Sequence, residues 1–257
     1  MATKTFKDNV KNWIDKLKAS DIDGCITGSC LLNADFDMWQ NKPDIDVFVY
    51  SDRYMIWAIA ELMFRYGLEL GIDSSEISRL QEEQKMRWLI EEKRNKSKVT
   101  NITLATIKLH DEKTGIIINV SCKGGCYSVA DVVNSFDMSI IMKGWDIRGK
   151  YQYDMTGQWG STNVATPNPI RMAKTDLDMV RTAYWIRQFD RVIKYWERGY
   201  DTRPMAKFYI EQIDCTIARG NIWTSEASQE FYDKYFEEFI EMREKISRWL
   251  SEVDKEM

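Results

Sequence analysis

Residues 44–50, DIDVFVY, constrain the fold most strongly, because they place two acidic residues in an otherwise apolar run. A short apolar run rich in Ile, Val and aromatic residues predicts a buried strand. Successive side chains of a strand point to opposite faces, so Asp44 and Asp46 are expected on one face and Ile45 and Val47 on the other. Carboxylates beside a core need a group of opposite charge. We therefore expect a cation next to Asp44 and Asp46.

Magnesium suits this pair of carboxylates. It prefers hard oxygen ligands, needs few protein carboxylates, and fills its other positions with water and substrate phosphates. The upstream turn at Gly28 and Ser29 suits the phosphates, because glycine lets the backbone come close and the serine hydroxyl and following amides can hold the oxygens. The alternative is an aspartate doublet that only caps a turn after Pro43.

Together, Gly28–Ser29 and the Asp44-Ile45-Asp46 strand resemble the signature of the DNA polymerase β-like nucleotidyltransferase superfamily. In that superfamily the Gly-Ser turn binds the triphosphate, and a strand with two aspartates between apolar residues binds two divalent metal ions. The resemblance implies that Gly28 and Ser29 bind an NTP. It also implies that Asp44 and Asp46 are catalytic residues that bind two Mg²⁺ or Mn²⁺ ions.

The superfamily also needs a third acidic residue on a neighbouring strand. Asn119 stands where an acid could be sought in the segment IIINVS, whereas Asp137 lies in an apolar run over 135–142 that resembles the "FD" strand of phage- and virus-type members. We expect Asp137 to be the third catalytic and metal-binding residue, on a strand beside 44–50. Residues 191–200, RVIKYWERGY, are similar to a helix that follows the catalytic lobe in such members.

A basic stripe is predicted on a helix over 174–198. Arg187, Arg191, Lys194 and Arg198 follow one another at spacings of four, three and four, which places them on one face. Like charges in a row favour an anion such as a triphosphate or a nucleic-acid backbone, so these residues are candidate substrate contacts. The alternative is that they pair with acidic residues of the final helix.

The order of elements predicts an α+β fold: a mixed β-sheet with flanking helices, followed by a helical C-terminal lobe. We expect a nucleotidyltransferase catalytic domain over 1–150 and a helical domain over 151–257. The expected strands are 24–28, 44–50, 99–109, 115–121 and 135–142. The expected helices are 5–19, 52–71, 75–95, 174–198, 204–219 and 227–252.

Composition narrows the class of protein. A net charge of −4 argues against a protein that coats nucleic acid non-specifically, because that mode needs a positive field overall. There is no apolar run long enough to span a membrane, and the N-terminus lacks the apolar stretch of a signal peptide. Five cysteines without a disulfide-framework spacing predict reduced thiols and a cytoplasmic protein. The single histidine, His110, is expected at the end of a strand.

The function expected from the resemblance is metal-dependent transfer of an NMP from an NTP to an acceptor hydroxyl, with release of pyrophosphate. The acceptor could be an RNA 3′ end such as that of tRNA, a DNA end, a protein side chain, a second nucleotide or a small molecule such as an aminoglycoside. The alternative is an inactive nucleotide-binding or protein-interaction module on the same scaffold.

Overall fold

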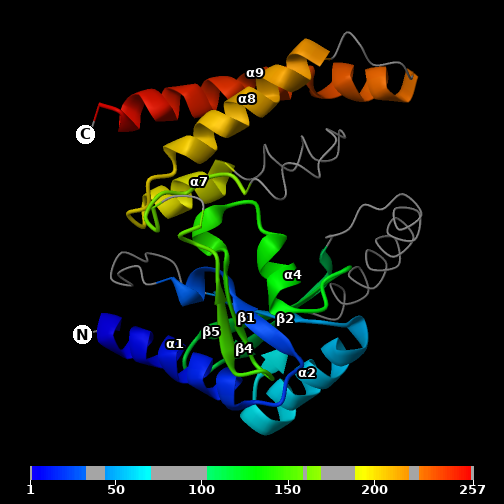
Figure 1. Ribbon diagram of the computed structural model, residues 1–257, viewed down its shortest axis with the longest axis vertical. Helices are drawn as coiled ribbons and strands as arrows, with labels where there is room; N and C mark the ends of the chain where they lie inside the picture. The colour runs from blue at the N-terminus through cyan, green and yellow to red at the C-terminus, as the bar shows by residue number, and fades with distance from the viewer. Residues whose placement is uncertain are drawn as a thin grey trace. The chain divides into compact units, whose positions relative to one another are not determined.

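The computed structural model describes residues 2–32, 44–70, 103–158, 161–168, 189–219 and 226–255. It confirms a mixed α/β fold with a mixed sheet, flanking helices and C-terminal helices (Figure 1). The chain divides into two compact units. The first consists of Met1–Phe136 and Ile141–Gln158, and the second of Asp137–Ile140 and Trp159–Met257.

The first unit is built on a sheet of seven strands in the order β3-β4-β5-β2-β1-β6-β7. β2 and β5 run parallel, and the other neighbouring strands are antiparallel. The strand that carries the two aspartates is therefore central, with β1 on one side and β5 on the other. The strands are β1 (Gly24–Thr27), β2 (Asp44–Val49), β3 (Glu69–Leu70), β4 (Thr103–Asp111), β5 (Ile116–Lys123), β6 (Lys143–Asp146) and β7 (Tyr151–Asp154).

The predicted alternation of β2 is confirmed. Ile45, Val47 and Val49 are completely buried, whereas Asp44 and Asp46 are only half-buried. Because successive side chains of a strand alternate between faces, the apolar face of β2 meets the core and the acidic face is turned away from it.

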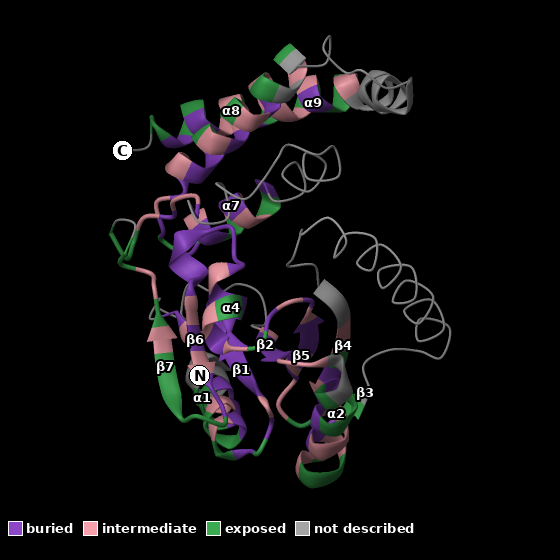
Figure 2. Cartoon of the chain, turned by 45° about the vertical axis from the view of Figure 1, so that its right-hand side comes forward, coloured by how far each residue is buried: buried purple, intermediate pink, exposed green. Residues whose placement is uncertain are grey.

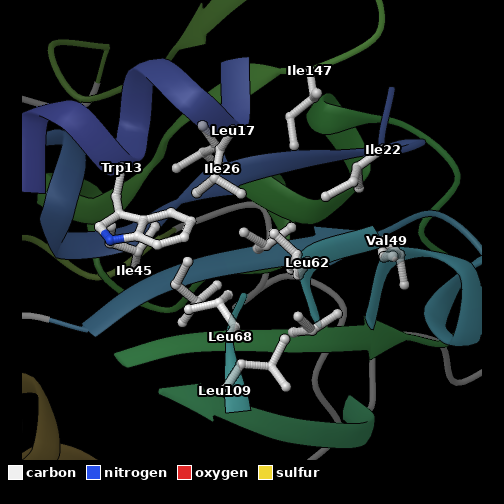
Figure 3. Close-up of a cluster of buried hydrophobic side chains, with 14 of the residues drawn as sticks. Trp13, Leu17, Ile22, Ile26, Ile45, Val49, Leu62, Leu68, Leu109 and Ile147 are labelled. Atoms are coloured by element: carbon white, nitrogen blue, oxygen red, sulfur yellow. The ribbon is translucent and has the colours of Figure 1, made fainter. Parts of the chain in front are cut away.

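Two helices, α1 (Ala2–Ala19) and α2 (Asp52–Tyr66), supply the other side of that core. Trp13 and Leu17 of α1 and Leu62 of α2 pack with Ile26 and Ile45 of the sheet (Figure 3). Burial follows position in the sheet, since β1 is buried along its length and β7 at the edge is mostly exposed (Figure 2).

The expected strand over 135–142 is wrong. A short helix, α4 (Val129–Asn134), comes first, because the Ser128 side chain accepts a hydrogen bond from the Asp131 amide and caps it. Residues 135–138 then have no regular structure apart from an isolated bridge at Met138, and a 3₁₀-helix, η3 (Ser139–Ile141), follows. The apolar residues of 135–142 therefore lie in irregular and 3₁₀-helical structure. Strands β6 and β7, which follow in the chain, were not predicted.

Other expected elements are found with shifted ends. The helix expected over 52–71 ends at Tyr66, where Gly67 takes a φ of +70°. The strands expected over 99–109 and 115–121 correspond to β4 and β5. The helix expected over 75–95 lies outside the described residues.

In the second unit, α7 (Phe189–Trp196), α8 (Arg203–Arg219) and α9 (Glu226–Val253) are described. The last two confirm the helices expected over 204–219 and 227–252. Of the helix expected over 174–198, residues 174–188 lie outside the described part, and the helix ends at Trp196 before Gly199, which has a φ of +82°. The ring of Trp249 on α9 makes edge-to-face contacts with the rings of Phe189 and Trp196 on α7.

Candidate functional site

The register of the sheet brings a row of side chains to the acidic face. Asp46 is opposite Thr27 of β1 and opposite Asn119 of β5, while Asp44 is opposite Ile117. Directly paired residues of neighbouring strands point to the same face. Thr27, Asp46 and Asn119 therefore lie side by side across three strands, with Asp46 in the middle.

The Gly-Ser turn lies directly against this row. A 3₁₀-helix, η1 (Gly28–Leu31), follows β1 directly. It contains Ser29, which is buried. Gly28 has a φ of +81°, and a Cβ atom added to it would lie 2.6 Å from Oδ2 of Asp46. The turn and the paired carboxylates are thus brought together, as the two motifs predicted.

Asn119 connects the two aspartates. Its Nδ2 donates to Oδ1 of Asp46 at 3.0 Å and more weakly to Oδ2 of Asp44 at 3.4 Å. An amide group that donates to both carboxylates reduces their mutual repulsion without adding a net charge. On β5, a strand next to the aspartate pair, the residue directly opposite Asp46 is thus the neutral Asn119 and not an acid.

Two buried oxygens flank Asp46. The Oδ1 atom of Asn119 and the Oγ1 atom of Thr27 are both buried and have no hydrogen-bond partner among the described residues. A buried acceptor without a partner costs about 1–3 kcal/mol. Carboxylate, amide and hydroxyl oxygens are the hard ligands that Mg²⁺ and Mn²⁺ take, so the donor set fits such an ion. Within the described ranges, no group of three or more His, Cys, Asp or Glu side chains is placed to hold a metal ion.

Asp137 is not on a strand beside the aspartate pair, which corrects that expectation. The two neighbours of β2 are β1 and β5, and neither carries Asp137. Asp137 belongs to the second unit and is buried there, and Nη1 of Arg191 donates to its two carboxylate oxygens at 3.1 and 3.2 Å. Its role as a metal ligand stays a prediction.

The structure places three of the four predicted basic residues. Arg191 is bound to Asp137, and Lys194 is exposed on α7. Arg198 follows the end of α7 and is buried, with its guanidinium 5.5 Å from the ring centre of Tyr195. The three residues thus differ in exposure and do not form one solvent-facing stripe. Arg187 lies outside the described residues.

Two polar residues of β4 were not predicted as site residues. Lys108 is opposite Asn119, and His110 is opposite Ile117, so both lie on the acidic face of the sheet. The sequence feature that could have indicated them is the alternation of these polar residues with the apolar Ile107 and Leu109. His110 is the last residue but one of β4, which confirms its expected place at a strand end.

The Cys30 thiol, which is close enough to Asp46 to feel its charge, has a raised pKa. Burial raises the pKa of the Cys30 thiol far above its usual value, and the charge of Asp46 raises it further. The thiol also donates to the carbonyl oxygen of Thr27. All five cysteines are free thiols, as predicted. A nucleophilic cysteine is thus disfavoured here, and the chemistry falls to the oxygen ligands.

The chain matches no protein-family model and no curated protein sequence. Among the described helices, none combines the length and apolar character needed to cross a bilayer.

Proposed function

We propose that this protein is a metal-dependent nucleotidyltransferase that moves an NMP from an NTP to an acceptor hydroxyl and releases pyrophosphate. The observation that carries the proposal is the placement of Gly28 against the carboxylate of Asp46. It joins a turn suited to phosphates with a pair of carboxylates suited to a divalent ion. The resemblance of these motifs to the DNA polymerase β-like superfamily supports the same reaction.

Asp44 and Asp46 would hold the divalent ions, Mg²⁺ or Mn²⁺, of which the superfamily uses two. Asn119 Oδ1 and Thr27 Oγ1 are the neutral oxygens that flank them. When bound, the ions neutralise phosphate charge and lower the pKa of the acceptor hydroxyl. The amide of Asn119 donates to both carboxylates and so fixes their positions relative to each other.

Gly28 and Ser29 would hold the phosphates that leave. The absence of a side chain on Gly28 lets the turn lie directly against the Asp46 carboxylate, and the Ser29 hydroxyl can donate to a phosphate oxygen. In this type of reaction the protein contributes mainly position and charge neutralisation. The side chains of this row are suited to both.

A second candidate function is nucleotide binding without transfer. The observation in its favour is that Asn119, which is neutral, occupies the strand position beside Asp46. A site with fewer carboxylates could bind a metal nucleotide but support the chemistry poorly.

We also propose that the protein works in the cytoplasm, with RNA such as tRNA among the possible acceptors. Four of the five free cysteines are buried as thiols. Persistent free thiols are typical of a reducing compartment.

The test compares the native chain with Asp46→Asn, Asp44→Asn and a control, Asp21→Asn, whose side chain is 93% exposed. Magnesium-dependent binding of each labelled NTP is measured first, and then pyrophosphate release with RNA, DNA and protein as acceptors. We expect turnover to fall by about a thousandfold or more in the first two variants and to be kept in the control. Binding without release for every acceptor would support the second candidate. Absence of magnesium-dependent NTP binding in the native chain would overturn both.

A further inference from the structure

Lys108 extends the row of site residues by one strand. It is opposite Asn119, which is opposite Asp46, so the three side chains lie on one face across β4, β5 and β2. Neighbouring strands are about 5 Å apart, so Lys108 begins two strand spacings from Asp46 and has a flexible four-carbon stem to reach back. Leu109, its neighbour in the chain, is fully buried in the core.

Lys108 carries a charge that its described neighbours do not neutralise. It is exposed and has no ion-pair partner in the part of the chain that the structure describes. Its cross-strand neighbour Asn119 is neutral. On β3, the strand at the other side of β4, Glu69 is opposite His110 and not opposite Lys108. An ammonium group is thus available beside the carboxylates.

The proposed reaction fixes which substrate meets this lysine, so the inference rests on the proposed function. In phosphoryl and nucleotidyl transfer the attacking and leaving oxygens lie roughly in line on opposite sides of the phosphorus. In the proposed site, the turn at Gly28 and Ser29, at the end of β1, binds the leaving pyrophosphate. The acceptor must then approach from the other side of Asp46, where Asn119, Lys108 and His110 lie.

We infer that the acceptor is a polynucleotide end, and that Lys108 contacts the backbone phosphate next to the attacking hydroxyl. A lysine is a common phosphate ligand and acts as a point charge. Asn119 and His110 beside it can form hydrogen bonds to a sugar hydroxyl or phosphate. A cationic acceptor such as an aminoglycoside would be repelled by Lys108, so the site selects among the acceptors that the scaffold allows.

The test measures binding of a short fluorescein-labelled RNA by anisotropy, with the full chain, Mg²⁺ and no NTP, over a range of NaCl concentrations. The variants are Lys108→Gln and a control, Lys113→Gln, which changes an exposed lysine in the turn between β4 and β5. We expect the first variant to lose about fivefold in affinity, and the slope of log K against log salt to fall by about 0.7, the value for one phosphate of a single strand. The control should match the native chain.

A second measurement identifies the contacted group. An RNA with an uncharged methylphosphonate at its last linkage should bind the native chain as weakly as the ordinary RNA binds the Lys108→Gln variant. NTP binding, measured on the same samples, distinguishes a failure of the inference about the acceptor from a failure of the proposed function on which it rests. If the native chain binds magnesium NTP but both lysine variants bind RNA equally well, the inference on the acceptor is overturned and the proposed function stands. If the native chain does not bind magnesium NTP, the proposed function itself is overturned.

Discussion

Gly28 holds a left-handed backbone conformation, with a φ of +81°, directly against the carboxylate of Asp46. A Cβ atom at position 28 would lie 2.6 Å from Oδ2 of Asp46, too close for either to stay in place. The other carboxylate oxygen of Asp46 accepts a hydrogen bond from Asn119, so the carboxylate cannot move away without loss. The turn, the acidic strand and β5 are thus coupled through Asp46.

The first prediction concerns Gly28→Ala. We expect this change to abolish magnesium-dependent NTP binding and to destabilise the protein by about 1–2 kcal/mol, the cost of a left-handed alanine. The reason is that the new methyl group displaces the Asp46 carboxylate. Titration with a fluorescent NTP and urea unfolding measure the two effects.

The matched control is Gly67→Ala. Gly67 also has a positive φ, of +70°, but a Cβ atom there would meet nothing within 4 Å. Gly67→Ala should therefore lose no more stability than Gly28→Ala and should bind NTP normally. Equal NTP affinities for the two variants would show that the contact with Asp46 does not matter.

The second prediction concerns Asn119→Asp. Without metal, a third carboxylate beside Asp44 and Asp46 removes the amide donor and adds repulsion, so the midpoint of thermal unfolding should fall by about 2–4 °C for each kcal/mol lost. With Mg²⁺ or Mn²⁺ the added charge should strengthen metal binding, so the variant should be stabilised by the ion more than the native chain is. Thermal unfolding with and without each ion measures both effects.

The control is Asn12→Asp. It adds the same negative charge at an exposed position of α1, a helix that carries none of the site residues. Its unfolding midpoint should respond to the ions as that of the native chain does. If Asn119→Asp responds no more strongly than Asn12→Asp, Asn119 is not beside a metal site.

The local pattern of the sequence predicted the acidic strand well. The alternation of Asp44, Ile45, Asp46 and Val47 fixes which side chains enter the core, because the period of a strand is two. The turn at Gly28 was predicted for the same kind of local reason, since its conformation favours glycine.

Strand pairing could not be read from the sequence. Which strands adjoin β2 depends on contacts between residues far apart in the chain, so Asp137 and Asn119 were both open as the third position. The segment 135–142 was read as a strand because it is apolar and contains β-branched residues, but it holds a 3₁₀-helix, η3, at Ser139–Ile141. The position of Lys108 beside Asn119 follows only from the β4–β5 register.

The third prediction concerns Asp111, at the end of β4. Burial alone would raise the pKa of its carboxyl, but hydrogen bonds from Thr114, Trp13 and the amides of 113 and 114 outweigh this and hold the pKa below its usual value. Nε1 of Trp13 donates to Asp111 at 2.8 Å across the core. Asp111→Asn should lower the free energy of unfolding by about 1–2 kcal/mol at neutral pH.

The effect should depend on pH in a definite direction. The folded pKa of Asp111 is lower than the unfolded one, so the ionised carboxylate stabilises the fold above about pH 4 and this contribution is lost as the pH falls further. The difference between the native chain and Asp111→Asn should therefore shrink between neutral pH and pH of about 3. Urea unfolding followed by tryptophan fluorescence at both pH values measures it. A difference that is constant with pH would contradict the assigned hydrogen bonds.

The fourth prediction concerns Asp137 and Arg191, which form an ion pair in the second unit. The side chain of Asp137 is 2% exposed and that of Arg191 is 31% exposed, so loss of the arginine removes an ion pair from a buried carboxylate. Arg191→Ala should destabilise the protein by about 3 kcal/mol, and Asp137→Ala by a similar amount. The double variant should lose less than the sum of the two, because the ion pair between Asp137 and Arg191 can be lost only once.

Mn²⁺ affinity decides between this structural role and metal binding by Asp137. The isosteric change Asp137→Asn should weaken the ion pair and lower the unfolding midpoint, while Mn²⁺ binds as tightly as to the native chain. A carboxylate that ligates the ion would behave differently, because its removal would cost about tenfold or more in Mn²⁺ affinity, as loss of Asp46 should. Isothermal titration with Mn²⁺ on the native chain, Asp137→Asn and Asp46→Asn measures all three affinities. Equal losses of Mn²⁺ affinity in Asp137→Asn and Asp46→Asn would show that Asp137 is the third ligand and does more than pair with Arg191.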